Sequence, residues 1–506
     1  MCQPSTGDKP TQRVIIAGAG PAGLLMTSLL LARNKESDAT VYYDVTLIDG
    51  LQDFGALTKQ ELQKSFRSWM LGLAPHGLDA IRELPSLYED YVKGEGVQLD
   101  EVSIYLGGKK MTAGDFGEDQ EAFVVDRNFI VAAMARYVKE VHENDDYYTS
   151  MYQCRCQYVD YENKRVLVRD KETNKEEYLD YDLLIGCDGV RSTVREAMIK
   201  RHSDFACDIR DIFADIKAVH VELPKDVSAT SMSLIPTPFP LFQGIALPET
   251  GNKINISCGT THNNFDNIAK ELKSDDYKVV AKYVKENFAA FQLVDYDDFA
   301  KQWVGQRWNQ TGMVHCNFYH SSQMGIVIMG DAAHATSPSI GMGMNTALRD
   351  AQALYNILKE TKDDLSSALP KFSKTRVKEG NSLSTLAFDL YCLDAKQQTR
   401  GVIHQVVRTA LNNWFPKFVE EHPQAMIGRR GVDLSDVFNH SVKLGIIQKH
   451  RTINEKIMHE YFEQSCGMVK SEVTSSCNNS SLLKKALYFS GFALAVAVFM
   501  LEKHII

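Results

Sequence analysis

Apolar and polar runs alternate along the N-terminal part of the chain in the order expected of strands joined by helices. The run 13–17 (RVIIA) is apolar and ends in glycines, 24–33 has helical composition, and 43–48 (YDVTLI) is a β-rich run closed by Asp49. This strand–turn–helix–strand order begins a doubly wound parallel sheet and so predicts an α/β fold. Further apolar runs predict a strand at 122–126, a helix at 129–138 and a second strand at 183–185.

The middle of the chain has a different pattern. Residues 151–187 predict a small antiparallel sheet with a turn near Asn163 and Lys164. Apolar and polar positions alternate in 216–221 and 254–257, with a turn at 249–252. Such alternation is typical of an antiparallel sheet with one solvated face.

The C-terminal half is mainly helical. Residues 264–300 predict helices, and 324–329 (MGIVIM) predicts a buried strand that runs into a Gly-Asp pair. From 346 to about 462 the pattern is helical again, and we expect it to break near Pro370, Pro416 and Pro423.

The two ends of the chain differ from this globular part. Residues 1–12 are polar and carry neither a signal peptide nor a transit pattern. Residues 466–483 include a Ser-, Thr- and Asn-rich stretch that indicates a linker, and 484–503 hold an uncharged apolar run of 16 residues flanked by lysines. As a helix this run would span about 24 Å against a hydrocarbon core of roughly 30 Å, and the lysines can snorkel.

We therefore expect a single-pass C-terminal membrane anchor at 484–503, with the lipid bilayer as its partner and the catalytic part in the cytosol. The mitochondrial outer membrane and the endoplasmic reticulum are the expected locations. The alternative is a buried C-terminal helix of the globular part.

Composition narrows the class of protein. Among 506 residues, 65 are acidic and 56 basic, which gives a net charge of −9 and argues against a nucleic-acid partner. Hydrophobic residues make up 44% and charged residues 24%, as in a globular chain. The ten cysteines lack disulfide-scaffold spacing and indicate reduced thiols. We assign no metal site, since HExxH and CxxC are absent and His315, Cys316 and His320 lie near a strand.

Three glycine- and aspartate-containing turns, each after an apolar strand, carry the candidate chemistry. The first is Gly18-Ala19-Gly20-Pro21-Ala22-Gly23, with Asp49 at the end of the next strand. Such glycines let a pyrophosphate approach backbone N–H groups at a helix N-terminus, and the acidic residue accepts from ribose hydroxyls.

The second turn holds Asp188 and Gly189, directly after the strand 183–185. The third begins at Gly330 and Asp331 and continues through Pro338, Gly341, Gly343, Met344 and Asn345. Asp331 can accept from ribityl or ribose hydroxyls, and the backbone amides of 341–345 can face a flavin edge or an oxyanion.

In this order the three turns resemble the single-component FAD-dependent aromatic hydroxylases, the group A monooxygenases with the fold of p-hydroxybenzoate hydroxylase. The likeness covers roughly residues 13–360 and is greatest to the kynurenine 3-monooxygenase branch. Its other matches are 67–73 (RSWMLGL), 126–128 (DRN) and the C-terminal helices followed by an apolar segment.

The resemblance implies a division into domains. An FAD-binding domain would comprise 12–68, 121–204 and 312–350, and a substrate domain with an antiparallel sheet would comprise 69–120 and 205–311. A C-terminal helical region would follow at 351–465, before the linker and the anchor. The implied FAD-binding residues are Gly18, Gly20, Ala22, Gly23, Asp49, Arg67, Arg127, Asp188, Gly189, Gly330, Asp331, Pro338, Gly341, Gly343, Met344 and Asn345.

The resemblance also implies a reaction in which NADPH or NADH reduces FAD. A flavin C4a-hydroperoxide formed with O₂ then hydroxylates or epoxidises a small aromatic or lipophilic substrate. No protein side chain is needed as an acid–base catalyst, and we assign none. The protein would bind the cofactor, orient the substrate and exclude water.

The substrate is expected to differ from that of kynurenine 3-monooxygenase. The arginine with which that family holds a carboxylate aligns with Glu101, and no arginine lies between Arg82 and Arg127. A carboxylate needs a charged partner to offset its desolvation, although Lys109 or Lys110 remains an alternative. We therefore expect a lipophilic or weakly polar substrate in an apolar pocket formed by Trp69, Met70, Phe116, Phe239, Phe242 and Phe388.

Three other functions stay open at this point. The chain can be a kynurenine 3-monooxygenase proper, or a flavin-dependent reductase of prenyl double bonds with the same fold, akin to geranylgeranyl reductase. It can also be a membrane-tethered FAD-binding scaffold without turnover. Uptake of O₂ during turnover separates an oxygenase from a reductase.

Overall fold

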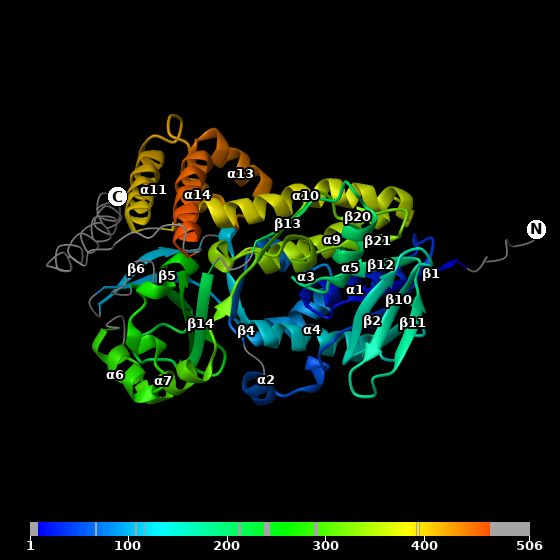
Figure 1. Cartoon of the computed structure of the whole chain (residues 1–506), viewed down its shortest axis with the longest axis horizontal. Coiled ribbons are helices and arrows are strands. Elements are labelled where there is room, and N and C mark those ends of the chain that lie inside the picture. The colour runs from blue at the N-terminus through cyan, green and yellow to red at the C-terminus, as the bar shows by residue number, and fades with distance from the viewer. Residues whose placement is uncertain are drawn as a thin grey trace, which may run out of the picture. The chain divides into compact units, whose positions relative to one another are not determined.

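The computed structural model in Figure 1 describes residues 9–65, 68–106, 109–116, 118–210, 214–236, 243–287, 292–390, 392–393 and 395–465. Arg67, Phe239 and Phe242 lie outside the described residues, as do the linker 466–483 and the anchor 484–503. The chain forms two compact units. The first comprises Met1–Val97, Phe123–Asp211 and Gly312–Ser384, and the second comprises Gln98–Ala122, Ile212–Thr311 and Thr385–Ile506.

The helices of the first unit are α1 (Pro21–Arg33), α2 (Lys59–Ser65), α3 (Pro75–Ile81), α4 (Arg127–His142), α5 (Thr193–Arg201), α8 (Asp331–His334), α9 (Gly343–Glu360) and most of α10 (Leu365–Asp389). Short 3-10 or π turns are η1 (Phe54–Ala56), η2 (Leu87–Val92), η3 (Lys93–Glu95) and η7 (Pro338–Ile340). Its strands are β1 (Thr11–Ala17), β2 (Tyr42–Ile48), β3 (Met70–Leu73), β4 (Gly96–Gln98), β7 (Phe123–Asp126), β8 (Tyr148–Met151), β9 (Cys154–Asp160), β10 (Arg165–Asp170), β11 (Glu176–Asp180), β12 (Leu183–Gly186), β13 (Cys207–Arg210), β19 (Met313–Cys316), β20 (His320–Ser321) and β21 (Ile326–Ile328).

A six-stranded sheet with the order β20-β21-β12-β1-β2-β8 forms the centre of the first unit. All pairs except β20–β21 are parallel, with Val14 opposite Leu183 on one side and Val45 on the other. Because both faces of these strands are covered, they are apolar along their length, and β12 is buried at every position. The predicted doubly wound α/β fold is confirmed.

One hydrophobic core joins this sheet to the surrounding elements. It includes residues of β1, β2, β12 and β21, of the helices α1, α4 and α9, and of the antiparallel sheet β11-β10-β9. Helix α1 packs against α4 and α9 (Figure 1), and 11 of its 13 residues are buried. Burial on nearly every side explains why its sequence is mostly apolar.

The second unit has the strands β5 (Glu101–Leu106), β6 (Lys109–Asp115), β14 (Ala214–Glu222), β15 (Ser231–Pro236), β16 (Gln243–Glu249), β17 (Lys253–Thr261) and β18 (Asn309–Gln310). Its helices are α6 (Tyr277–Asn287), α7 (Tyr296–Gly305), α11 (Ala395–Trp414), α12 (Pro423–Met426), α13 (Leu434–Lys443) and α14 (Ile446–Ser465). Short 3-10 turns are η4 (Glu118–Gln120), η5 (His262–Asn267) and η6 (Lys270–Lys273).

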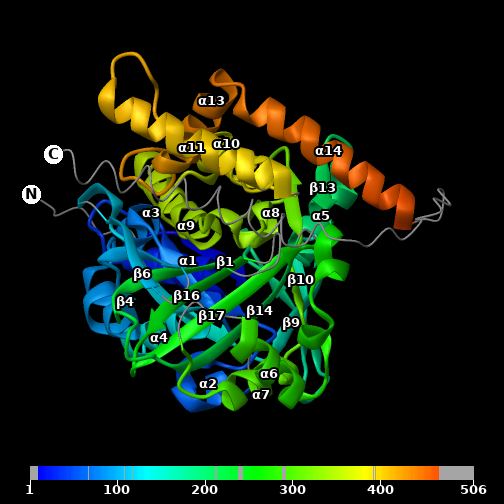
Figure 2. The ribbon, with the colours of Figure 1, turned by 90° about the vertical axis from the view of Figure 1, so that its left-hand side faces the viewer.

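The strands of the second unit form one seven-stranded sheet in the order β18-β14-β17-β16-β15-β5-β6, and β14, β16 and β17 run side by side in Figure 2. Val219, Ile254 and Ile256 point from the sheet into a core with Phe299 and Trp303 of α7. The sheet is mixed, because β15 and β5 pair in parallel. The predicted antiparallel pairing of 216–221 with 254–257 is confirmed. The parallel strand 101–106 was not predicted, since it is too far from 231–236 in sequence for a local pattern to reveal the pairing.

The expected helix break at Pro370 is wrong. Pro370 lies inside α10, which runs unbroken from Leu365 to Asp389. Proline in a helix leaves the carbonyl four residues earlier, here that of Ser366, without its donor. Both Ser366 and Pro370 are exposed, so water can satisfy this carbonyl and the helix continues.

In the described part of the chain, no helix is both long enough and apolar enough to cross a bilayer. The apolar run at 484–503 is not among those residues, so the anchor stays a prediction.

Candidate functional site

The three predicted turns lie side by side at one edge of the parallel sheet in the first unit. They follow β1, β12 and β21, which are neighbours in the strand order. The Cys187 N–H donates to Ala17 O at 2.7 Å, and the Met329 N–H donates to Gly186 O at 3.0 Å. The carboxyl edge of such a sheet is where ligands bind in open α/β folds.

The first two turns touch closely, and Gly18 makes this contact possible. It has φ +108°, and a Cβ atom on it would lie 2.2 Å from Cys187 O. A Cβ on Gly23 would lie 1.9 Å from Gly18 O. Neither position therefore tolerates a side chain, because the β1 turn, the start of α1 and the β12 turn occupy the same space.

The N-terminus of α1 is open. Gly20 is the N-cap and Pro21 follows, with no side-chain cap and no acidic residue in the first turn. A Cβ on Gly20 would meet nothing within 4 Å. A helix start with free N–H groups and space in front of it is suited to a phosphate.

Asp49 lies beside this helix start, at the end of β2. Its Oδ2 accepts from the Ala19 N–H at 2.7 Å and its Oδ1 accepts from the Leu51 N–H at 2.6 Å. Both bonds fix the carboxylate next to the first turn. Each oxygen retains a lone pair for a further donor such as a ribose hydroxyl.

In the second turn, Asp188 has one oxygen that lacks a partner. Its Oδ2 accepts from the N–H groups of Thr193 and Val194 at 2.7 and 3.2 Å. Its Oδ1 is buried and has no hydrogen-bond partner among the described residues. Burial raises the pKa of this carboxyl, against the effect of its hydrogen bonds. An oxygen of this kind fits a ligand that donates a hydrogen bond.

An ion cluster that the sequence did not reveal supports the third turn. Asp350 of α9 is fully buried and accepts from the Gly330 N–H at 2.9 Å, from His334 Nε2 at 2.6 Å and from Arg376 Nε at 2.6 Å. Burial opposes ionisation, but His334 and Arg376 together lower the pKa of Asp350. The cluster thereby fixes Gly330 at φ +58° and leaves the adjacent Asp331 exposed at the turn.

Asn345 also has a structural part in this region. Its Nδ2 donates to Gly72 O at 2.8 Å and to Gly341 O at 3.1 Å, and its Oδ1 accepts from the Ala74 N–H at 2.8 Å. The buried amide thus ties the start of α9 to β3. Helix α9 begins at Gly343 without a side-chain cap, so the amides of its first turn have no capping acceptor.

The remaining predicted site residues lie at the start of α4 and in the three turns. The Arg127 guanidinium lies 4.9 Å from the centre of the Trp69 ring, and its backbone N–H donates to Trp69 O. Ala22 packs near Gly330, and Gly189 and Pro338 belong to the second and third turns. Arg67 is not among the described residues.

Arg195 is a further residue that sequence reasoning missed. Its Nη2 donates to Val190 O at 2.6 Å and its Nη1 donates to Ala332 O at 2.8 Å. One buried guanidinium therefore connects the second turn to the third. The residue lies in the first turn of α5, shortly after Gly189, but no spacing in the sequence indicates its partner at Ala332.

These residues fit FAD. An uncapped helix start, the buried Asp188 Oδ1 and the carboxylates of Asp49 and Asp331 offer donors for phosphates and acceptors for hydroxyls along one sheet edge. Because the elements come from three separated segments, the match depends on the fold and not on one glycine motif.

Comparison with known proteins agrees with this assignment. A family model described as an FAD binding domain matches residues 152–369. The chain is 24% identical over 441 residues to kynurenine 3-monooxygenase of Neurospora crassa, covering 81% of this chain and 83% of that enzyme. It is 24% identical to the Caenorhabditis elegans kynurenine 3-monooxygenase, covering 80% and 87%.

Among solved structures, 2-methyl-3-hydroxypyridine-5-carboxylic acid oxygenase matches with a TM-score of 0.59 at 16% identity, over 85% of this chain and 98% of that one. This likeness shows the fold alone. Together with the relatives and the FAD domain match, it confirms the resemblance deduced from the three turns. The chain has the fold of the FAD-dependent aromatic hydroxylases, and it is an FAD-dependent monooxygenase similar to the kynurenine 3-monooxygenases.

Proposed function

We propose that the three turns hold FAD in defined roles. The amides at the start of α1 bind the pyrophosphate, Asp49 accepts from the adenosine ribose, and Asp188 and Asp331 accept from further hydroxyls. The amides at the start of α9, including those of Gly343 and Met344, face the flavin edge. Bound FAD supplies the redox chemistry, with electrons from NADPH or NADH and oxygen from O₂.

We further propose that the substrate is a lipophilic or weakly polar aromatic compound without a carboxylate that needs an arginine clamp. The support comes from the basic side chains on the sheet of the second unit. Lys110 of β6 already forms an ion pair with Glu101 of β5. This pair lowers the pKa of Glu101, so its negative charge stays beside Lys110 and neutralises it.

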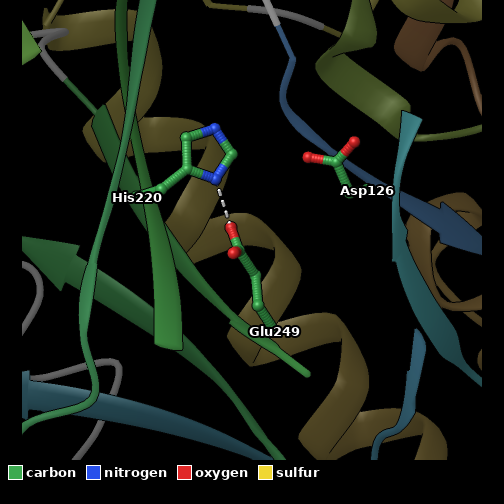
Figure 3. Close-up of side chains that lie close together, drawn as sticks. All are labelled: Asp126, His220 and Glu249. Carbon is green, nitrogen blue, oxygen red and sulfur yellow. Dashed lines mark hydrogen bonds and ion pairs between the residues drawn. The ribbon is translucent and has the colours of Figure 1, made fainter. Parts of the chain in front are cut away.

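Two further basic side chains of the same sheet have partners as well. His220 Nδ1 lies 2.5 Å from Glu249 Oε1, and Figure 3 shows the two side chains pointing toward each other. Lys217 donates to Trp303 O at 2.7 Å and lies against the rings of Trp303 and Trp308. Burial lowers its pKa to about 8. At each of these three side chains, a substrate carboxylate would have to displace the partner already present.

A substrate panel tests this function. Purified, FAD-loaded protein is mixed with NADPH and with either kynurenine or lipophilic aromatics and alkenes, and NADPH oxidation and O₂ uptake are recorded together. We expect stimulation of both by a lipophilic compound and not by kynurenine. NADPH oxidation without O₂ uptake would indicate a reductase, and no stimulation by any compound would indicate a binding protein.

Lys110→Met is the matched variant. If Lys110 has no part in substrate binding, the KM of the active compound stays within twofold of the wild-type value. Stimulation by kynurenine, with a KM that rises strongly in Lys110→Met, would show that this lysine replaces the missing arginine and would contradict the proposal.

We also propose that the protein is attached to a membrane through residues 484–503. We propose a second membrane contact in the second unit, on one face of α11 and the turn after it. This face exposes Val407, Leu411, Trp414, Phe415 and Phe418, and Phe418 is 87% exposed. Aromatic residues of this kind favour the bilayer interface. The linker 466–483 reaches at most about 60 Å when extended, which keeps this unit near the anchoring bilayer.

A further inference from the structure

Two thiols far apart in sequence meet in the first unit. Cys207 of β13 and Cys316 of β19 are direct partners across an antiparallel pair of strands. Their Sγ atoms are 3.6 Å apart, although 109 positions separate them along the chain. Both are free thiols. No spacing in the sequence connects these two cysteines, so their juxtaposition comes from the fold alone.

The backbone geometry suits a disulfide. The Asn317 N–H donates to Ala206 O at 3.1 Å, so 206 and 317 form a hydrogen-bonded pair. Because such pairs alternate, the adjacent Cys207–Cys316 pair is of the non-hydrogen-bonded kind, with Cα atoms about 4.5 Å apart. Disulfides accept Cα separations of roughly 4.4–6.8 Å. The two strands therefore need little movement to bring the sulfurs into bonding distance.

The two thiols differ in reactivity. Cys207 is half-buried, whereas Cys316 is fully buried. The Cys316 S–H donates to the Cys207 sulfur, and the positive charge of Arg195 adds to this effect, so the pKa of Cys207 is lowered. The same contact raises the pKa of Cys316. Cys207 is thus the accessible thiolate and Cys316 the thiol behind it.

We propose that Cys207 and Cys316 are a modification site, a dithiol that a peroxide converts reversibly into a cross-strand disulfide. The Cys207 thiolate attacks one peroxide oxygen, the O–O bond breaks, and a sulfenic acid and one water form. The Cys316 sulfur then attacks Cys207 Sγ, the S–O bond breaks, and hydroxide leaves with the Cys316 proton as a second water. The two thiols lose two electrons and two protons, and H₂O₂ becomes two waters.

The bond would act on the segment that holds the third turn. In β19 the Val314 N–H donates to Ala335 O at 2.8 Å, just after α8. Arg195 of α5, whose charge acts on Cys207, donates to Ala332 O in α8. A disulfide between β13 and β19 would close a long chain loop, which restricts the unfolded state and raises the thermal midpoint.

The test uses the full-length, FAD-loaded protein. It is treated with a small excess of H₂O₂, alkylated under denaturing conditions and digested with trypsin without reductant. Cys207 and Cys316 are the single cysteines of the tryptic peptides 202–210 and 308–349. We expect these two peptides to appear as one cross-linked species, two hydrogens lighter than their sum, which dithiothreitol separates. The thermal midpoint of the oxidised protein should rise and return on reduction.

Cys316→Ser and Cys258→Ser are the matched variants, since Cys258 is a buried thiol of β17 in the second unit. In Cys316→Ser the cross-link should be absent, and Cys207 should accumulate as a sulfenic acid that dimedone traps. Cys258→Ser should behave as the wild type. Over-oxidised Cys207 without a cross-link in the wild type, or a cross-link between other cysteines, would overturn the proposal, and both readouts need only the wild-type protein.

Discussion

A methyl group added at Gly20 should weaken cofactor binding and leave folding unaffected. Its φ is −75°, which alanine adopts freely, and a Cβ there would point into open space. If the FAD pyrophosphate lies in front of α1, that methyl group takes its place. Gly20→Ala should therefore weaken FAD binding roughly 10–100-fold, by the cost of about 1–3 kcal/mol that overpacking usually carries. Titration of the apoprotein with FAD, followed by flavin fluorescence, measures this.

Gly94→Ala is the control for Gly20→Ala. A Cβ on Gly94 also meets nothing within 4 Å, but this residue lies in η3, outside the three turns. Its FAD affinity should equal that of the wild type, and both variants should unfold within a few degrees of it. An unchanged FAD affinity in Gly20→Ala would show that no phosphate lies at this helix start.

Two aspartates near the third turn should respond in opposite ways to the same substitution. Asp350 is buried and receives three donors, so an amide in Asp350→Asn would set its own N–H₂ against them and leave Arg376 without its charge partner. Breaking a buried pair costs about 3–5 kcal/mol. Chemical denaturation of the apoprotein should show a loss of this size.

Asp331→Asn is the matched comparison, because Asp331 is exposed at the turn that Asp350 supports. Its unfolding free energy should stay within about 0.5 kcal/mol of the wild-type value, as for other surface changes. FAD affinity should fall roughly tenfold or more through loss of a charge-assisted hydrogen bond. Equal stability losses in the two variants would contradict the assigned difference between support and ligand contact.

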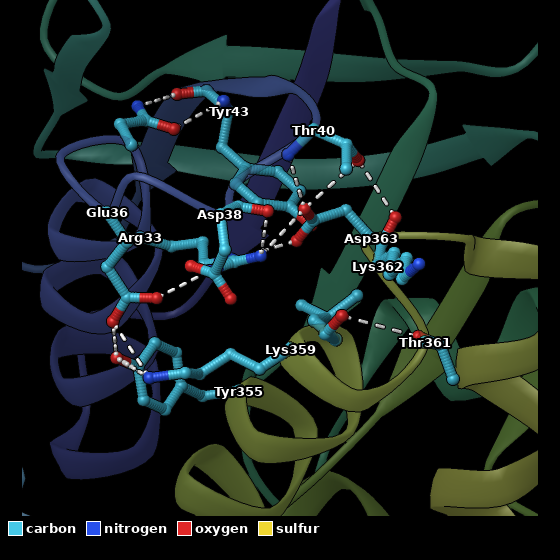
Figure 4. Close-up of polar contacts among 12 residues, drawn as sticks. Arg33, Glu36, Asp38, Thr40, Tyr43, Tyr355, Lys359, Thr361, Lys362 and Asp363 are labelled. Carbon is cyan, nitrogen blue, oxygen red and sulfur yellow. Dashed lines mark hydrogen bonds and ion pairs between the residues drawn. The ribbon is translucent and has the colours of Figure 1, made fainter.

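At the scale of elements, a buried ion pair joins the end of α1 to the turn between α9 and α10. Arg33 and Asp363 are both fully buried, and Arg33 Nε and Nη2 donate to the two Asp363 oxygens at 3.0 Å each. Tyr43 OH and the Thr40 N–H donate to the same carboxylate (Figure 4). The network thus connects α1, β2 and α9 at the edge of the sheet away from the three turns.

This network predicts a pH dependence of stability. Burial opposes the charge of Asp363, but its hydrogen bonds from Arg33, Thr40 and Tyr43 lower its pKa below that of the unfolded chain. The native state therefore binds fewer protons here, and the stabilisation is present above the unfolded pKa of about 4 and lost as the pH falls through and below it. Asp363→Asn removes this contribution at every pH.

Asn tolerates the φ of +60° found at Asp363, so the substitution leaves the backbone of the turn unstrained. Thermal unfolding between pH 7 and pH 3 should show the variant less stable by about 3–5 kcal/mol at pH 7, with the gap narrowing toward pH 3. A gap that stays constant, or widens on acidification, would mean that Asp363 is not the titrating group.

At the scale of the whole molecule, removal of residues 484–506 tests the membrane attachment. We expect the full chain to sediment with membranes and the truncated chain to be released, because the apolar run would be the main source of binding energy. Sedimentation with liposomes of neutral and anionic lipid measures the bound fraction. Some loss of activity on truncation is compatible with this expectation.

The double variant Trp414→Ser/Phe418→Ser tests the second proposed membrane contact, which is the exposed face of α11 and the turn after it. In the truncated chain this double change should remove any residual binding, whereas in the full chain it should matter little. Full sedimentation of the chain without 484–506 and without these two aromatic side chains would show that neither segment is the membrane contact.

The sequence by itself determined the class of the fold and the place of the three turns. Strand, glycine turn and helix follow one another within about 20 residues in each case, so Gly18, Asp49 and Gly330 could be located from local pattern alone. These signals are local because a tight turn needs particular backbone angles and a buried strand needs continuous apolar residues.

Only the tertiary structure decided which distant residues support these turns. Asp350 and Arg376 beneath Gly330, Arg195 against Ala332, and Cys207 opposite Cys316 are contacts between segments that no spacing rule connects. The parallel pairing of β5 with β15 and the continuation of α10 through Pro370 belong to the same class. Such features depend on long-range burial and on which groups water can reach, and both exist only once the chain is folded.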